Sequence, residues 1–341
     1  MNVLRGWAAV AALIALSACG GGSTAHASPS PPATASPSPS VNPNVPVARG
    51  YHHMFGTPSG VVLFGGETAP PRLAGRALGD VWVYNASSGW TKRQANGEKD
   101  GMMVYDPRSK RMVVFADLEG RFQSIAETWV YFPGTDTWQR EALGNRPDSY
   151  ANGGIAYDSA ADRIIVFEGV TWAYNSETNT WKNMQPKSGP DHRDFPAMDY
   201  DPVSHRVFLF GGGFDDIGTD QTWTYDYKRN SWTQLHPVVS PPARMHGVMV
   251  YEPASRRFIL FGGEATWTHN PFSDTWAYDP KLNTWTNLSP ATSPSPRARH
   301  AMAYDAQSKT IVMFGGGETP PEFRADTWIY DPAVNTWTQR S

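Results

Sequence analysis

Two sets of charged side chains recur along this sequence and could together hold a ligand or move its protons. The acidic set consists of Glu67, Asp117, Glu168, Asp215, Glu264 and Glu318. The basic set consists of Arg49, Arg193, Arg244 and Arg297, joined by His52, His246, Arg299 and His300. Arginines bind anionic groups, and a carboxylate or histidine whose pKa lies near neutrality can act as a general acid or base. We expect the two sets to face each other around one site.

The repetition of these charges also has an architectural explanation, because features that recur in every structural repeat usually serve the architecture. Positions that break the repeat are better functional candidates. One such position lies five residues before a recurring tyrosine and holds, in turn, Asp100, Asn152, Phe195, His246 and Arg299. Packing alone would favour similar residues there, so this variety predicts an asymmetric polar lining.

Aromatic side chains in segment 264–273 add to these candidates. Trp267, His269 and Phe272 are costly to expose unless they meet a ligand, a sugar ring or a peptide for example. The alternative is that they pack on a neighbouring loop. The ligand-binding candidates are therefore Arg193, Arg244, His246, Arg297, Arg299, His300, Glu67, Glu264, Glu318 and Trp267.

Three markers that recur six times indicate the elements that carry these residues. The first is a tryptophan two residues before a tyrosine, at Trp82, Trp129, Trp172, Trp223, Trp276 and Trp328. The second is a later tryptophan, at Trp90, Trp138, Trp181, Trp232, Trp285 and Trp337. The third is an apolar run ending in phenylalanine, usually followed by glycines. Self-similarity at a spacing of about 50 residues is typical of propeller blades.

Each repeat divides into four short strands by alternation and turn residues. In the fifth repeat these are His246 to Tyr251, Arg257 to Gly262, Thr275 to Tyr278 and Asn283 to Thr286. The Phe-Gly-Gly pairs, the Asp-Thr-Trp-x-Tyr-Asp segment at Asp274 to Asp279, and the later Asn-Thr-Trp resemble the kelch repeat family. The second and third repeats depart from it, with Phe115-Ala116-Asp117 and Phe167-Glu168-Gly169.

The resemblance implies an all-β, six-bladed kelch-type β-propeller with four antiparallel strands per blade, over residues 48–341. The predicted blades are 48–91, 98–140, 146–183, 191–235, 242–288 and 295–340. Each blade is expected to come from its own repeat, unless Val41 to Ala48 adds a strand at the seam. The links between second and third strands vary greatly in length, and variable loops on a rigid scaffold are where function is expected.

Two kelch enzyme types can be compared with this chain. The galactose oxidase type holds copper and carries a Tyr–Cys crosslink. Since the only cysteine here is Cys19, that cofactor cannot be built, and we expect no metal and no cofactor. Envelope epimerases resembling N-acetylneuraminate epimerase hold an anionic sugar with arginines. That resemblance implies a clamp of Arg193, Arg244, Arg297 and Arg299, with Glu264, Glu318, His246 or His300 as proton carriers.

The N-terminus resembles a bacterial lipoprotein signal. Arg5 precedes an apolar run from Trp7 to Ala18, and Leu16-Ser17-Ala18-Cys19 resembles a lipobox. The run is shorter than the roughly 20 apolar residues that span a bilayer. We therefore expect a signal peptide over residues 1–18 and lipidation of Cys19. A Pro- and Ser-rich segment, residues 19–47, is expected to be a disordered tether, because it can bury little apolar surface. The alternative is a cleaved signal with a chance cysteine.

These patterns favour a binding protein over an enzyme. The formal net charge of −3 argues against nucleic acid, whose binding needs a basic face. We expect a membrane-anchored, extracytoplasmic binding or scaffold protein of the bacterial envelope, held in the outer membrane or on the outer face of the cytoplasmic membrane. Its propeller is expected to be monomeric and to recognise a protein or glycan on the variable-link face. The alternative is an envelope sugar epimerase or mutarotase, and no catalytic residue is assigned.

Overall fold

The computed structural model describes residues 43–68, 77–96, 100–117, 126–141, 147, 152–215, 217–266, 269–318 and 322–340. In these ranges the chain contains strands and turns and no helix. Its strands form antiparallel four-stranded sheets. The predicted all-β class is therefore confirmed. Cys19, the signal peptide and most of the tether lie outside the described residues, so those expectations remain predictions. Within the described residues no helix is both apolar and long enough to cross a membrane.

Six of the sheets are built from strands of consecutive repeats, and we call them blades 1 to 6. Blades 1 and 2 contain β1 (His53–Thr57), β2 (Gly60–Phe64), β3 (Asp80–Asn85), β4 (Gly89–Asn96), β5 (Asp100–Asp106), β6 (Arg111–Asp117), β7 (Ala126–Phe132) and β8 (Thr137–Arg140). Blades 3 and 4 contain β9 (Gly154–Asp158), β10 (Arg163–Phe167), β11 (Thr171–Asn175), β12 (Thr180–Asn183), β13 (Ala197–Asp201), β14 (Arg206–Phe210), β17 (Thr222–Asp226) and β18 (Ser231–Leu235). Blades 5 and 6 contain β19 (Val248–Glu252), β20 (Arg257–Phe261), β23 (Thr275–Asp279), β24 (Thr284–Asn287), β25 (Ala301–Asp305), β26 (Thr310–Phe314), β27 (Thr327–Asp331) and β28 (Thr336–Arg340).

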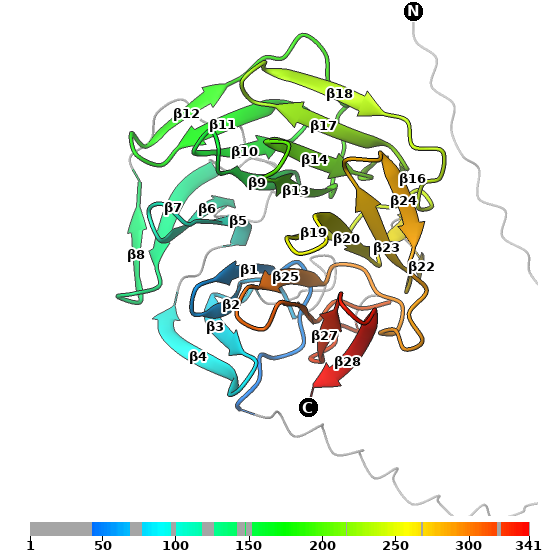
Figure 1. Ribbon diagram of the computed structural model, residues 1–341. Helices are drawn as coiled ribbons and strands as arrows, with labels where there is room; N and C mark the ends of the chain where they lie inside the picture. The colour runs from blue at the N-terminus through cyan, green and yellow to red at the C-terminus, as the bar shows by residue number, and fades with distance from the viewer. Residues whose placement is uncertain are drawn as a thin grey trace, which may run out of the picture. The chain divides into compact units, whose positions relative to one another are not determined.

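The blades surround an axis, as Figure 1 shows, with the first strand of each blade innermost and the fourth outermost. The innermost strands contact their neighbours around the whole ring, and β25 of blade 6 contacts β1 of blade 1. Residues 43–48 form no strand, and Val45 packs on the apolar cluster between blades 6 and 1. Each blade is therefore made from its own repeat, and side-chain packing closes the ring.

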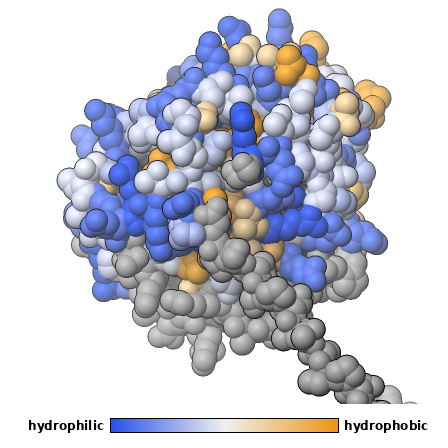
Figure 2. Space-filling view, turned by 90° about the horizontal axis from the view of Figure 1, so that it is seen from below, coloured by the Kyte–Doolittle hydropathy of each residue, from blue (hydrophilic) through white to orange (hydrophobic). Residues whose placement is uncertain are grey.

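The core lies between the blades. Each of six apolar clusters combines residues of two adjacent sheets, for example Val61 and Leu63 of blade 1 with Val312 and Phe314 of blade 6. A single sheet could not hide both of its apolar faces, so the ring is the unit that buries them. The side of the ring that lies lowest in Figure 1 is mostly hydrophilic among its described residues, with hydrophobic ones scattered (Figure 2).

The later tryptophan of each repeat connects its blade to the preceding one. In five blades its indole N–H donates to a buried threonine hydroxyl at the start of the third strand of the preceding blade. These bonds are Trp90 to Thr327, Trp181 to Thr128, Trp232 to Thr171, Trp285 to Thr222 and Trp337 to Thr275, at 2.8–3.1 Å. In blade 2 the indole N–H of Trp138 has no partner among the described residues, because the matching position in blade 1 is Val81.

A seventh small sheet was not expected from the sequence. It joins two hairpins of different blades: β15 (Gly213–Phe214) with β16 (Ile217–Gly218) from blade 4, and β21 (Glu264–Thr266) with β22 (His269–Pro271) from blade 5. Segment 264–273 therefore contains a hairpin that pairs with its neighbour through Ile217 and Thr266. Trp267, the aromatic candidate of this segment, lies outside the described residues.

Candidate functional site

Arg49, Arg244 and Arg297 are held by a carboxylate at the start of the third strand of the same blade or directly before it. Each guanidinium is at most 1 % exposed. The bidentate partners are Asp80, Asp274 and Asp326, at 2.6–2.9 Å. Each arginine also donates to the carbonyl of the first glycine after its second strand, at 2.9–3.0 Å. The donors that could clamp an anionic ligand are thus used inside the blade.

Arg193 occupies the same position in blade 4, with an amide in place of the carboxylate. It donates to Gln221 Oε1 at 2.8 Å and to the carbonyl of Gly211 at 3.3 Å. Burial lowers the pKa of its guanidinium. The tryptophan two residues after each acidic or amide partner donates to it as well, as Trp276 does to Asp274 at 2.7 Å. This network explains the Asp-x-Trp motif as an architectural one.

The predicted meeting of the acidic and basic sets is therefore wrong for Arg49, Arg193, Arg244, Arg297 and Glu318. The carboxylates that pair with Arg49, Arg244 and Arg297 belong to the Asp-x-Trp motif and not to the acidic set. The backbone amide and carbonyl of Glu67 exchange hydrogen bonds with those of Gly50. Glu318 pairs at 2.6 Å with Arg324, which is outside the basic set.

His52 and His300 are packed between blades rather than presented to solvent. Their rings lie edge-on to Phe314 and Phe261 of the preceding blades, at centroid distances of 5.6 and 5.5 Å. Burial lowers the pKa of His300 to about 3 and that of His52 well below its usual value. Both histidines are therefore neutral at physiological pH, which makes them unsuitable as proton carriers there.

Three of the five repeat-breaking positions, Phe195, His246 and Arg299, meet at the axis, where Tyr51 joins them. The side chain of Asp100 lies outside the described residues. Tyr51, Phe195, His246 and Arg299 stand two residues before the innermost strands of blades 1, 4, 5 and 6, each with a left-handed φ of 53° to 63°. Their backbones form a chain of hydrogen bonds from blade to blade. The amides of Phe195, His246, Arg299 and Tyr51 donate to the carbonyls of Asn152, Phe195, His246 and Arg299, respectively.

Their side chains gather around Glu264, and we call Tyr51, Phe195, His246, Glu264 and Arg299 the axial cluster. Arg299 forms a salt bridge with Glu264 and donates through Nε to the Tyr51 hydroxyl at 2.7 Å. His246 Nδ1 lies 2.9 Å from Glu264 Oε1, and its ring stacks on Phe195 at 3.8 Å. Arg299, His246 and Glu264 are members of the predicted sets that the structure does bring together.

The electrostatics of the axial cluster are dominated by burial. Burial raises the pKa of Glu264 to about 7, although the charge of Arg299 opposes this. Burial, together with the charge of Arg299, lowers the pKa of His246 well below its usual value. Glu264 is therefore the group of this cluster that can exchange a proton near neutral pH. In the described part of the chain, no three His, Cys, Asp or Glu side chains gather closely enough to hold a metal ion.

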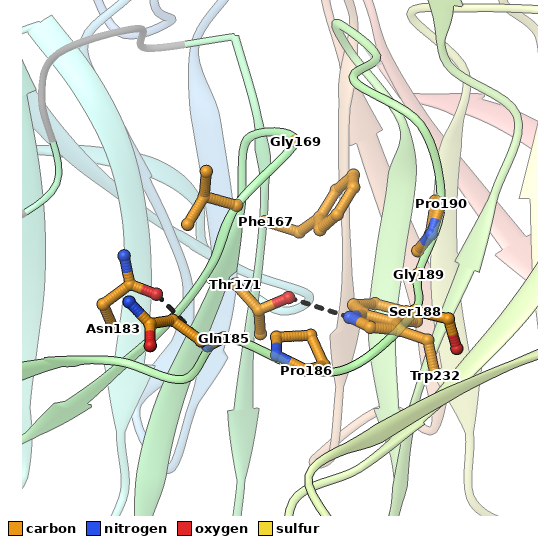
Figure 3. A pocket seen from close by; sticks show the side chains of 11 residues that line it. Phe167, Gly169, Thr171, Asn183, Gln185, Pro186, Ser188, Gly189, Pro190 and Trp232 are labelled. Carbon is orange, nitrogen blue, oxygen red and sulfur yellow. Dashed lines mark hydrogen bonds between the residues drawn. The ribbon is translucent and has the colours of Figure 1, made fainter.

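A pocket between blades 3 and 4 was missed by the sequence reasoning. It has a volume of about 340 Å³, and Figure 3 shows its lining. Phe167 and Trp232 are the buried aromatic rings of this lining, which also includes Val170, Pro186 and Pro190. Trp232 is fixed by its bond to Thr171 (Figure 3).

The pocket is present because the link between the second and third strands is short in the third repeat. In blades 4, 5 and 6 the second glycine of the pair donates its amide to the carbonyl of the arginine in the next blade, as Gly263 does to Arg297 at 2.9 Å. Gly263 needs its left-handed φ of 93° for this approach. In blade 3 only Glu168, Gly169 and Val170 separate β10 from β11. That link is too short to cover the next blade, and its shortness was the sequence signal for the pocket.

Comparison with known proteins agrees with this architecture. A family model described as the KLHDC2/KLHL20/DRC7 Kelch-repeats domain matches residues 109–293 and 148–341. The mouse protein Multiple epidermal growth factor-like domains protein 8 is 28 % identical over 120 residues, which is 34 % of this chain and 4 % of that protein. Its rat counterpart is 28 % identical over 110 residues, 31 % of this chain and 4 % of the relative. The chain therefore spans a small part of the relatives it matches.

Proposed function

Because this chain belongs to the kelch-repeat family, as the family match over most of its length shows, we propose that it is a protein-binding scaffold that uses the face of its variable links. Kelch propellers are folds suited to holding protein partners. A rigid ring that displays loops of different length on one face is a common basis for recognition. The difference between the two faces of the ring carries the proposal.

The opposite face is uniform and is occupied by its own hydrogen bonds. Its turns join strands one to two and three to four of each blade. In four blades a tyrosine hydroxyl of the third strand donates to an asparagine of the following turn, at 2.8–2.9 Å; the asparagines are Asn179, Asn230, Asn283 and Asn335. Acidic residues such as Asp201 cap the other turns through backbone amides. These side chains stabilise turns and leave the variable-link face as the place for recognition.

Site-specific photo-crosslinking in the producing cells tests this proposal. A photoreactive residue would replace Val170 or Phe214 on the variable-link face, or Val203 or Leu282 on the turn face, which are 45 %, 56 %, 55 % and 63 % exposed. We expect discrete protein adducts from the first pair and none from the second. Adducts from the turn face alone, or none from either face, would contradict the proposal.

The location of this scaffold is a second part of the proposal. The signal-like N-terminus and Cys19 support lipid anchoring on the extracytoplasmic side of a bacterial membrane, since several acyl chains on one residue suffice for stable anchoring. We expect Cys19→Ala to move the protein from the membrane pellet to the soluble fraction. A variant Ser17→Ala serves as the matched control. An unchanged distribution for Cys19→Ala would rule out the lipid anchor.

A sugar epimerase or mutarotase remains as a second candidate because of one observation. Glu264, with its pKa raised to about 7, lies beside Arg299 and His246 at the axis. The expected clamp is reduced to Arg299, since Arg193, Arg244 and Arg297 are engaged within their blades. Incubation with N-acetylneuraminate anomers, followed by proton NMR, tests this candidate. Turnover that Glu264→Gln abolishes would support the enzyme, and equilibration at the uncatalysed rate would exclude this substrate.

A further inference from the structure

Blade 4, which contributes Trp232 to the pocket, also carries an exposed apolar hairpin. Phe214 and Ile217 are directly opposite each other in the β15–β16 hairpin, so their side chains lie on one face of it. They are 56 % and 66 % exposed. Large apolar side chains grouped in this way are unusual on a protein surface and mark interaction sites.

His192 connects the hairpin to the pocket. Its ring lies edge-on to Phe214 at a centroid distance of 5.8 Å, and its Nδ1 is 3.1 Å from the carbonyl oxygen of Glu168. Gly169, which lines the pocket, allows this approach, since a Cβ atom there would lie 2.6 Å from His192 Nδ1. We call the surface formed by Val170, Pro186, His192, Phe214 and Ile217, together with the buried Pro190 of the pocket lining, the loop-face strip.

The charges that border the loop-face strip are mainly negative. Asp191 precedes His192, and Asp194 follows it after the buried Arg193. Gly213 beside Phe214 exchanges backbone hydrogen bonds with Asp194. Asp215 and Asp220 are exposed next to the hairpin strands, and Lys187 is the exposed lysine of the pocket-lining segment. An apolar surface with an acidic border complements a segment that is apolar and basic.

We propose that the loop-face strip binds an extended segment of a partner protein that carries aliphatic or prolyl side chains flanked by lysine or arginine. This inference rests on the proposed scaffold function and names its partner chemistry. Apolar side chains of the segment would enter the pocket over Trp232 and cover Phe214 and Ile217. Its basic side chains would face the aspartates of the border. The buried anchors would supply most of the affinity, and the charges would supply selectivity.

The test uses a phage-displayed random library of peptides about a dozen residues long, selected on the purified protein. We expect enriched peptides to combine Leu, Ile or Pro with Lys or Arg, and to bind more weakly as salt rises. The double variant Phe214→Ser/Ile217→Ser should weaken them about tenfold or more, which corresponds to about 1.4 kcal/mol. The matched control Leu282→Ser/Val334→Ser removes equally exposed side chains, 63 % and 66 %, from the turn face and should leave binding unchanged.

The outcomes separate this inference from the proposed function. No enrichment, or enrichment of acidic peptides, would overturn the inference. Peptides that tolerate Phe214→Ser/Ile217→Ser but block adduct formation at Val170 would refute Phe214 and Ile217 as contacts, and with them the inference as stated, and leave the scaffold function standing. Peptides whose binding is lost only in the Leu282→Ser/Val334→Ser variant would overturn both the inference and the proposed function. Unchanged thermal melting of each double variant excludes unfolding as the cause.

Discussion

Substitution of Val81 by threonine should restore a hydrogen bond that five of the six blades already have. The indole N–H of Trp138 is buried and has no partner among the described residues, while the matching indoles donate to threonine hydroxyls at 2.8–3.1 Å. Val81 is 1 % exposed and lies in the cluster against which Trp138 packs. Threonine has nearly the same shape as valine, so its hydroxyl can take the position of the partner without repacking the sheet.

The magnitude follows from the value of one buried hydrogen bond. A net hydrogen bond contributes about 0.5–1.5 kcal/mol, and a buried unpaired donor costs about 1–3 kcal/mol. The desolvation of the new hydroxyl offsets part of this gain, so we expect Val81→Thr to raise the free energy of unfolding by about 1 kcal/mol. For a domain of this size such a change raises the melting temperature by about 2–4 °C.

Differential scanning calorimetry or chemical denaturation of the purified protein measures this effect. The matched control is the reverse change in blade 6, Thr327→Val, which removes the acceptor of Trp90 and should cost about 1–3 kcal/mol because the indole is then left unpaired. A destabilising Val81→Thr, or a neutral Thr327→Val, would refute the assignment of these tryptophans as connections between blades.

Arg297→Met should lower the free energy of unfolding by about 3–5 kcal/mol, because it leaves the Asp326 carboxylate without its buried partner. A variant that melts like the wild type would show that the arginines are available for ligands. The buried His52, His246 and His300 and the half-buried His53 have lowered pKa values. In the unfolded protein these histidines take up protons at about pH 6.5, which is higher than in the folded protein. The stability that they contribute should therefore be complete above about pH 6.5 and fall as the pH decreases towards 4. A flat profile of melting temperature in that window would contradict their burial. Burial and the charge of Asp194 raise the pKa of Glu168 to about 9. The stability that its protonated form contributes should therefore be lost as the pH rises from about 4.5 towards 9, and Glu168→Gln should remove this loss. Equal slopes of stability against pH for the two proteins between pH 5 and 9 would refute this.

The fold could be read from the sequence because each blade repeats its local signals. The strands of the fifth blade begin and end within two residues of the predicted limits, since alternation and turn residues fix the elements locally. The arginines were harder to interpret. A recurring Arg is compatible with a ligand clamp or with an architectural network, and only the bidentate contact between Arg244 and Asp274, 30 residues apart, distinguishes the two.

The candidate site was predictable where a position departs from its equivalents. The axial cluster contains Phe195, His246 and Arg299, whose variety at one repeat position indicated a lining. The seventh sheet was not predictable, because it depends on pairing between links of neighbouring blades, which is set by the geometry of the ring and leaves no local pattern. The pocket of the loop-face strip had a local signal in the short third link, but that signal indicates a pocket only once the neighbouring links are placed in the ring.

Hydrogen exchange of the protein with and without a selected peptide tests the central claim, recognition on the variable-link face, most directly. The account predicts added protection in residues 168–170, 186–194 and 213–219, with exchange unchanged in the turns around Val203, Leu282 and Val334. Protection confined to those turns would contradict it.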